Sequence, residues 1–225
     1  MSADAIDSVR NDFTLHNGKQ TSFTQGPQAE MIDLITKFEA QFGTNSTEDA
    51  AMRAKFVRLG FHDCVGGCDG CIDSGADNSG LDVPIYALQH IVDEANELSR
   101  ADVWAAAAFW AAGASQDPNR RNTHIDFSID MIGYGRTDCE NAPNENHQLD
   151  PQASGYNAGP VRHLPSADLD SHGLKDFFLQ EFGYSTRETV AIMGAHTLGK
   201  LHPENSGFNS GEIGWVVNDH ILDNK

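Results

Sequence analysis

Two histidine motifs, far apart in the sequence, constrain the fold of this chain more than any other feature. The first spans residues 58–64 (RLGFHDC) and the second spans residues 193–200 (MGAHTLGK). The residues before each motif have helical apolar spacing, which predicts that each histidine lies near the end of a helix. We therefore expect two helices that bring His62 and His196 face to face, with room for a flat cofactor between them.

The same periodicity predicts a mainly α fold. Proline, glycine and asparagine fill residues 115–167, where we expect a long irregular segment. A capping box at Ser185 and Glu188 starts the helix that leads to His196. The other predicted helices span residues 27–42, about 47–62, 81–98, 100–114 and 171–182.

Length and charge narrow the class of protein. A chain of 225 residues suits one domain. The net charge of −18 argues against nucleic acid or an anionic membrane as a partner, because both require clustered lysine and arginine. An acidic surface can steer a cationic substrate or a basic protein, or it can simply keep the protein in solution. No apolar run approaches the ~20 residues of a membrane-spanning helix.

The four cysteines, Cys64, Cys68, Cys71 and Cys139, suit two disulfides with three connectivities. A glycosylation sequon at residues 45–47 adds a second sign of an exported protein. We therefore predict secretion, with a cytoplasmic location as the alternative, since the first residues lack the apolar core of a signal peptide.

Arg58 and His62 are four residues apart and so project from one helical face. Residues 58–63 resemble the distal motif of the plant, fungal and bacterial haem peroxidase superfamily, and residues 77–81 (DNSGL) resemble the segment that follows it. A histidine can take a proton from peroxide and return it, and an arginine supplies a permanent positive charge. The resemblance implies that Arg58, His62 and Asn78 are catalytic and that Phe61 lines the pocket.

Residues 188–200 resemble the proximal segment of the same superfamily, especially its cytochrome c peroxidase and ascorbate peroxidase branch. The resemblance implies haem b between a distal and a proximal helix, with His196 as the iron ligand. Lys200 and His202 resemble residues near the haem propionates. Trp215 is the candidate for the tryptophan beneath the proximal histidine, with an ordinary core tryptophan as the alternative.

The resemblance covers roughly residues 28–225 and implies a single haem peroxidase-like domain over residues 1–225. Its distal half would span about 27–150 and its proximal half about 151–225. Asp102 and Arg136 resemble a buried structural ion pair of the family. We expect the C-terminal part of the usual fold, with the aspartate that supports the proximal histidine, to be missing or shortened.

Secretory members of the superfamily bind calcium through aspartates that match Asp63 and Asp69, although Cys71 replaces a hydroxyl ligand. Calcium is therefore an open expectation. Cys64 and Cys68 resemble a short-loop disulfide of the same branch, which would pair Cys71 with Cys139.

The predicted function is haem-dependent reduction of H2O2, with a small molecule or a protein as an unidentified one-electron donor. Ascorbate is doubtful as that donor, because Asn205 stands where ascorbate-type enzymes have an arginine. One alternative is a non-catalytic secreted binding or matrix protein on a peroxidase scaffold. The other is a radical S-adenosylmethionine enzyme, suggested by the spacing of Cys64, Cys68 and Cys71. The sequence does not indicate an oligomeric state.

Overall fold

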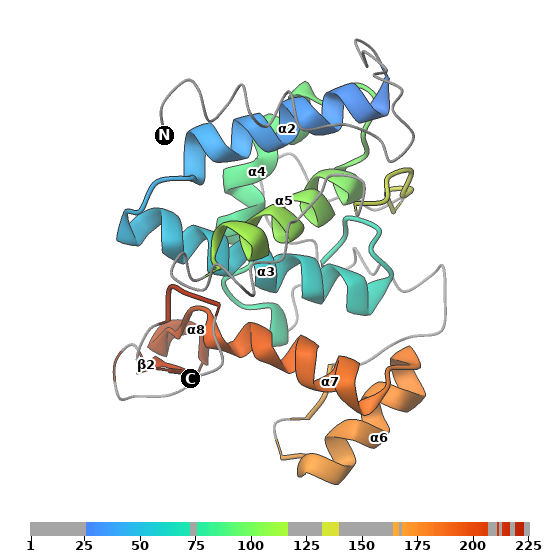
Figure 1. The fold of residues 1–225 in the computed structure, drawn as a ribbon, viewed down its shortest axis with the longest axis vertical. Coiled ribbons are helices and arrows are strands. Elements are labelled where there is room, and N and C mark those ends of the chain that lie inside the picture. Colours follow the sequence, from blue (N-terminus) through green and yellow to red (C-terminus); the bar gives the residue numbers. More distant parts are fainter. Residues whose placement is uncertain are drawn as a thin grey trace, which may run out of the picture.

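The computed structural model describes residues 26–72, 76–116, 132–139, 164–166, 168–206, 211, 213–216 and 219–222. In these residues the fold is almost entirely helical (Figure 1). Four long helices pack together: α2 (Pro27–Phe42), α3 (Thr47–Gly66), α4 (Asp82–Glu94) and α5 (Arg100–Ala114). A hairpin of α6 (Ser171–Phe182) and α7 (Thr186–Met193) lies below this bundle in Figure 1, on the side of α3.

Two 3-10 turns hold residues that were predicted to be functional. They are η1 (Ala76–Asn78) and η4 (Gly194–Thr197). After η4, β1 (Lys200–Leu201) pairs antiparallel with β2 (Ile213–Gly214), so that Lys200 lies opposite Gly214. The short helix α8 (Pro203–Ser206) follows β1 in the sequence.

The prediction of a mainly α fold is confirmed, and α2, α5 and α6 have the predicted bounds. The predicted end of α3 near His62 was too early. The helix continues to Gly66 and stops where Gly67 adopts a φ of 145°, which side chains disfavour. The prediction also placed His196 in a continuous helix, whereas α7 ends at Met193 and the histidine lies in η4.

The predicted helix over residues 81–98, which corresponds to α4, was too long. It ends at Glu94, because the chain after it binds to α2 instead of continuing the helix. The carboxylate of Glu30 accepts three backbone N–H groups, those of Asn96, Glu97 and Leu98, at 2.6–2.9 Å. A side chain 66 residues away thus ends the helix, which local pattern could not reveal. Most of the predicted irregular segment, residues 115–167, lies outside the described residues.

The hydrophobic core lies inside the four-helix bundle. Its members recur every three or four residues along each helix, as an apolar stripe requires. The largest fully buried ones are Met31, Phe38, Phe56, Leu59, Ile85, Leu88, Ile91, Val103 and Trp104. Each fully buried large side chain contributes roughly 1.5–3 kcal/mol. By contrast, the buried side chains of α6 and α7 are Phe178 and Thr189.

The alanine-rich sequence of α5 allows α3 and α5 to approach closely. A Cβ atom on Gly60 of α3 would lie 2.4 Å from the Cβ of Ala108, closer than two carbon atoms can pack. Small residues on both helices therefore fix α3 against α5 along the stretch that carries Arg58 and His62. This contact gives the distal residues a rigid support.

Residues 132–139 are bound to the bundle by hydrogen bonds, an ion pair and a disulfide. The buried carboxylate of Asp102 accepts a hydrogen bond from Gly135 N at 2.8 Å and pairs with Arg136 at 3.0 Å, as the resemblance implied. Disulfides join Cys64 to Cys68 and Cys71 to Cys139, which confirms the implied pairing. No described helix combines the length and the apolarity that crossing a bilayer requires.

Candidate active site

His62 and Asn78 form the centre of the distal site. His62 lies in the last two turns of α3, and Asn78 ends the turn η1, where its side chain is buried. Nδ1 of His62 lies 2.8 Å from Oδ1 of Asn78. An amide oxygen only accepts hydrogen bonds, so Nδ1 donates its proton and Nε2 stays basic. The structure thus brings together two predicted catalytic residues that are 16 positions apart.

The environment of His62 keeps the imidazole neutral. Burial lowers its pKa to about 4, and the nearby positive charges of Arg58 and His196 act in the same direction, while the hydrogen bond with Asn78 opposes the shift. Phe61 packs beside the ring, with the ring centroids 6.0 Å apart. A neutral, buried imidazole with a free basic nitrogen can accept a proton at neutral pH.

Arg58 lies one turn before His62, and its guanidinium group contacts the same turn that carries Asn78. Nη1 donates to the carbonyl of Ser79 at 2.9 Å and Nη2 donates to the carbonyl of Asp77 at 2.8 Å. Burial lowers the pKa of Arg58, although the group stays charged at neutral pH. The distal arginine is therefore close to His62, and its two terminal nitrogens are bonded to the backbone on both sides of Asn78.

His196 lies opposite the distal site. His196 contributes, as the smallest of several causes, to the lowered pKa of His62, which is the effect expected of two histidines near each other. The side chain of His196 is exposed to solvent, and partial burial by the surrounding protein lowers its pKa. Gly194 and Ala195 precede it, and a Cβ atom added to Gly194 would have no other atom within 4 Å. The small residues and the open space beside η4 are what a flat cofactor next to the imidazole would require.

Trp215 contacts His196, as predicted, but the contact is different from a buried stack. The ring centroids are 4.9 Å apart and the planes are tilted by 45°. The side chain is 51% exposed, so the alternative of an ordinary core tryptophan is wrong. β2, which ends next to Trp215, pairs with β1 just after η4, and this pairing brings the two residues together.

Sequence reasoning missed Asp219, which is buried beside the proximal segment. Its backbone carbonyl accepts from Gly199 N at 2.8 Å, and its carboxylate lies 3.7 Å from Lys200 Nζ and 3.3 Å from His220 Nε2. His202 lies 3.9 Å from the carboxylate of Glu204. The role predicted for Lys200 and His202, near the haem propionates, stays a prediction. Asp219 carries no local sequence signal, because only the pairing of β1 with β2 places it there.

Asp63 and Asp69 form an acidic pair behind the distal site. Asp63 is fully buried; burial and the charge of Asp69 raise its pKa to about 7. Oδ1 of Asp63 accepts from Gly70 N at 2.8 Å, whereas Oδ2 has no hydrogen-bond partner among the described residues. Such an unsatisfied buried oxygen can serve as a ligand for a cation.

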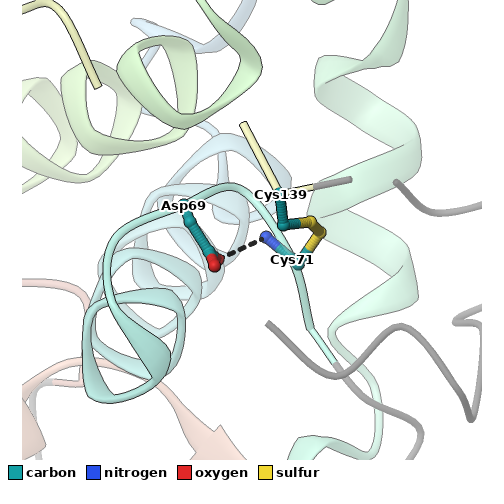
Figure 2. A group of neighbouring side chains, drawn as sticks. All are labelled: Asp69, Cys71 and Cys139. Atoms are coloured by element: carbon teal, nitrogen blue, oxygen red, sulfur yellow. Dashed lines mark hydrogen bonds between the residues drawn. A yellow bond between two sulfur atoms is a disulfide. The ribbon is translucent and has the colours of Figure 1, made fainter. Parts of the chain in front are cut away.

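Asp69 also lies within 4.8 Å of the sulfur atoms of Cys71 and Cys139 (Figure 2). The two sulfurs are bonded to each other, and therefore offer no thiolate to a metal. The other disulfide uses Cys64 and Cys68, so all four cysteines of the chain are paired. Iron–sulfur clusters require cysteine thiolates, and this pairing argues against the radical S-adenosylmethionine alternative.

The comparison with known proteins agrees with this geometry. A family model described as Peroxidase matches residues 36–213, a range that includes both histidine motifs. The chain belongs to the peroxidase family. This membership confirms the resemblance to the haem peroxidase superfamily that both motifs indicated.

Relatives of this chain include members of the predicted branch. It is 32% identical over 151 residues to cytosolic L-ascorbate peroxidase 2 of Oryza sativa subsp. japonica, which covers 67% of this chain and 49% of the relative. It is 25% identical over 201 residues to a putative heme-binding peroxidase of Yarrowia lipolytica, covering 82% and 58%. It is 30% identical over 133 residues to mitochondrial cytochrome c peroxidase of Candida albicans, covering 59% and 30%. The chain spans about half the length of the first two relatives.

Proposed function

We propose that this peroxidase-family chain binds haem b and reduces H2O2 with electrons from a one-electron donor. The observation that carries the proposal is the hydrogen bond between His62 and Asn78. His196 would hold haem through its iron, and haem would supply the redox chemistry. The overall reaction consumes H2O2, two electrons and two protons and releases two water molecules.

His62 moves the proton in this reaction. Its Nε2 takes a proton from one oxygen of H2O2 and returns it to the other oxygen as the O–O bond breaks. Asn78 holds Nδ1 protonated throughout, so Nε2 alone exchanges the proton. The positive charge of Arg58 stabilises the negative charge that develops on the departing oxygen.

The cysteines support the choice of haem b. Attachment of haem through thioether bonds requires free thiols, and Cys64, Cys68, Cys71 and Cys139 are all in disulfides. This supports haem b, which is held without covalent bonds. Extraction of the pigment into acidified organic solvent tests it: haem b leaves the protein, and a pigment that stays with the chain contradicts the assignment.

The first experiment is a spectrum of the purified chain with haem, before and after addition of H2O2. Haem uptake with a sharp Soret band that changes on addition of peroxide supports the proposal. A chain that never takes up haem would instead support the non-catalytic scaffold alternative. Haem uptake without any response to peroxide would reject the proposed reaction.

The electron donor can be identified by comparing chemically different donors. The names of the relatives refer to ascorbate and cytochrome c. Asn205 offers no positive charge to an ascorbate anion, whereas the net charge of −18 favours a basic protein donor through electrostatic steering. We therefore expect reduced cytochrome c to be oxidised faster than ascorbate at low ionic strength. The opposite order would contradict this choice.

Calcium is tested through Asp63 and Asp69. The unsatisfied Oδ2 of Asp63 supports a bound cation, and such a cation would stabilise the folded state. If calcium binds, the melting temperature rises with added calcium and falls with a chelator. Asp63→Asn, which removes the charged ligand, should abolish this dependence. A melting temperature that does not respond to calcium would exclude the site.

Two observations bear on the location. Disulfides persist in oxidising compartments, which supports the predicted export. Several relatives, however, are named as cytosolic, chloroplastic or peroxisomal proteins. Export therefore stays a prediction. Alkylation of thiols in intact cells tests it, because an exported chain carries no free thiol to label.

A further inference from the structure

The guanidinium group of Arg58 forms hydrogen bonds with the backbone on both sides of Asn78. Its Nη1 donates to the carbonyl of Ser79 at 2.9 Å, and its Nη2 donates to the carbonyl of Asp77 at 2.8 Å. These two carbonyls belong to the residues immediately before and after Asn78. One guanidinium group therefore bridges the peptide unit that joins Asp77 to Asn78 and the one that joins Ser79 to Gly80, so it holds the backbone on both sides of Asn78.

The turn around Asn78 needs such support because it is short. η1 has three residues, Ala76–Asn78, and the chain then reverses through Gly80 at a φ of +81°. Leu81 N donates to the carbonyl of Asn78 at 3.1 Å, and this bond closes the reversal. The bridge from Arg58 joins Asp77 to Ser79 across this short turn and so restricts how far the backbone around Asn78 can rearrange.

We propose that Arg58 is a positioning residue for His62, acting through the turn that holds Asn78. This deepens the proposed function, and it relies on that function only for the catalytic importance of the His62 tautomer. The chain of contacts runs from Arg58 to the carbonyls of Asp77 and Ser79, then through the amide of Asn78 to Nδ1 of His62. The arginine thereby determines which imidazole nitrogen carries the proton.

The shape of the guanidinium group explains why an arginine is required. Its planar fork presents several donors at fixed spacing and can bind two carbonyls at once. A lysine keeps the charge but presents a compact ammonium group that does not match the spacing of a fork. Arg58→Lys therefore separates the positioning role from the charge.

The test measures the tautomer of His62 directly, by 15N NMR of the full 225-residue chain, free of haem, with labelled histidine. In the wild-type chain we expect the proton on Nδ1. Asn78→Ala removes the acceptor and should shift the ratio toward the Nε2–H tautomer about fivefold, the effect of one ordinary hydrogen bond. Arg58→Lys should shift it in the same direction by a smaller factor.

The double variant decides whether Arg58 acts through Asn78. If it does, Arg58→Lys adds no further shift once Asn78 has been replaced by alanine, because the link to His62 is already broken. If Arg58→Lys shifts the tautomer ratio by the same factor in the Asn78→Ala chain as in the wild type, the two residues act independently and the proposal is overturned. A wild-type tautomer ratio in Arg58→Lys would overturn it as well.

Arg53 provides a matched control on the same helix. It also donates to two backbone carbonyls, that of Phe42 at the end of α2 at 2.7 Å and that of Thr44 in the connection to α3 at 2.9 Å. Neither carbonyl belongs to the turn that carries Asn78. Arg53→Lys should leave the tautomer of His62 unchanged. A shift as large as that of Arg58→Lys would show a general loosening of α3 and reject a specific role of Arg58.

A second variant keeps the test valid if Arg58→Lys fails to fold. Arg58→Gln retains amide donors but can no longer span both carbonyls, so the same partial shift is expected. An unchanged ratio in a folded Arg58→Gln chain would reject the proposal. The proposed function fails separately: a wild-type chain that takes up no haem, or does not react with H2O2, rejects it whatever the NMR result.

Discussion

The distal and proximal parts of this molecule support their histidines in different ways. Around His62, four helices share one core, and the contact of Gly60 with Ala108 fixes the helix that carries the site. Around His196, the support is a helical hairpin with Phe178 and Thr189 buried, followed by a 3-10 turn and two short strands. The distal residues are preorganised by a core, whereas the proximal histidine is presented on an exposed turn.

The difference also extends to the polar contacts. His62 has Asn78, and the turn that carries Asn78 is held by Arg58. His196 has the exposed ring of Trp215 beside it, and Asp219 bonds to the segment after it. A hydrogen bond within the folded chain thus orients the distal histidine, whereas the proximal histidine lies beside an exposed aromatic ring.

The largest expected effect separates the two histidines. His62→Leu should keep haem uptake but slow peroxide cleavage by about 10²–10⁴-fold, because the proton shuttle is lost. His196→Leu should instead weaken haem uptake, because the iron ligand is lost. Soret absorbance during haem titration and stopped-flow mixing with H2O2 measure the two effects. A normal rate of peroxide cleavage in His62→Leu would contradict the proton-transfer role.

A large loss of stability is expected in the distal part for Asp102→Ala. This change leaves Gly135 N and Arg136 without their acceptor and should lower the free energy of unfolding by about 2–3 kcal/mol. Denaturation in urea measures it. The exposed pair of Lys37 with Glu94 is the control: Lys37→Ala should change stability little, because solvent screens such pairs. Equal losses would contradict the importance of burial.

The two neighbouring residues His62 and Asp63 should give stability opposite pH dependences in the haem-free chain. The folded pKa of His62, about 4, lies below its unfolded value of 6.5, so its contribution is lost as pH falls from 6.5 to 4. The folded pKa of Asp63, about 7, lies above its unfolded value of 3.8, so its contribution is lost as pH rises from 4 to 7.

Single substitutions should separate these opposing dependences. Relative to the wild type, Asp63→Asn should gain stability as pH rises from 4 to 7, and His62→Gln should gain stability as pH falls from 6.5 to 4. Melting temperatures measured across this range provide the comparison. A difference from the wild type that does not change with pH would show that neither pKa is shifted by folding.

The smallest expected effect is a loss of stability that tests the contact of Gly80, in the distal part, with Asn205, in the proximal part. Gly80 has a φ of +81°, and a Cβ atom there would lie 2.6 Å from Nδ2 of Asn205. Gly80→Ala should therefore cost about 1–2 kcal/mol in backbone strain, with an added clash against Asn205. Asn205→Gly should relieve the clash but not the strain. If the double variant is no more stable than Gly80→Ala, the two parts do not touch as described.

Several elements could be predicted because their signals are local. The apolar spacing in residues 27–42 and the capping box of Ser185 and Glu188 depend on near neighbours, and both are present in the structure. The ends of α3 and α4 were wrong for a physical reason. The end of α4 depends on a carboxylate from α2, and the end of α3 depends on the conformation of Gly67.

In the candidate site, too, features that depend on local motifs could be predicted, whereas features that depend on distant contacts could not. Arg58, His62, Asn78 and His196 were selected from their motifs, and the structure brings them close to one another. The hydrogen bonds from Arg58 to the carbonyls of Asp77 and Ser79 could not be predicted. Every residue has a backbone carbonyl, so residue type does not show which carbonyls will accept a side-chain donor. Asp219 was missed for a similar reason, since its place depends on the pairing of β1 with β2.

The sequence by itself determined the helical class, the family and the residues that can carry out the chemistry, because these depend on residue type and local spacing. Tertiary structure decided how those residues are held: His62 by Asn78, the turn of Asn78 by Arg58, and His196 by an exposed turn beside Trp215. Those contacts join positions far apart in the chain. They form only when the core of the bundle brings the helices together. Local residue spacing therefore cannot predict which of these distant residues will be in contact.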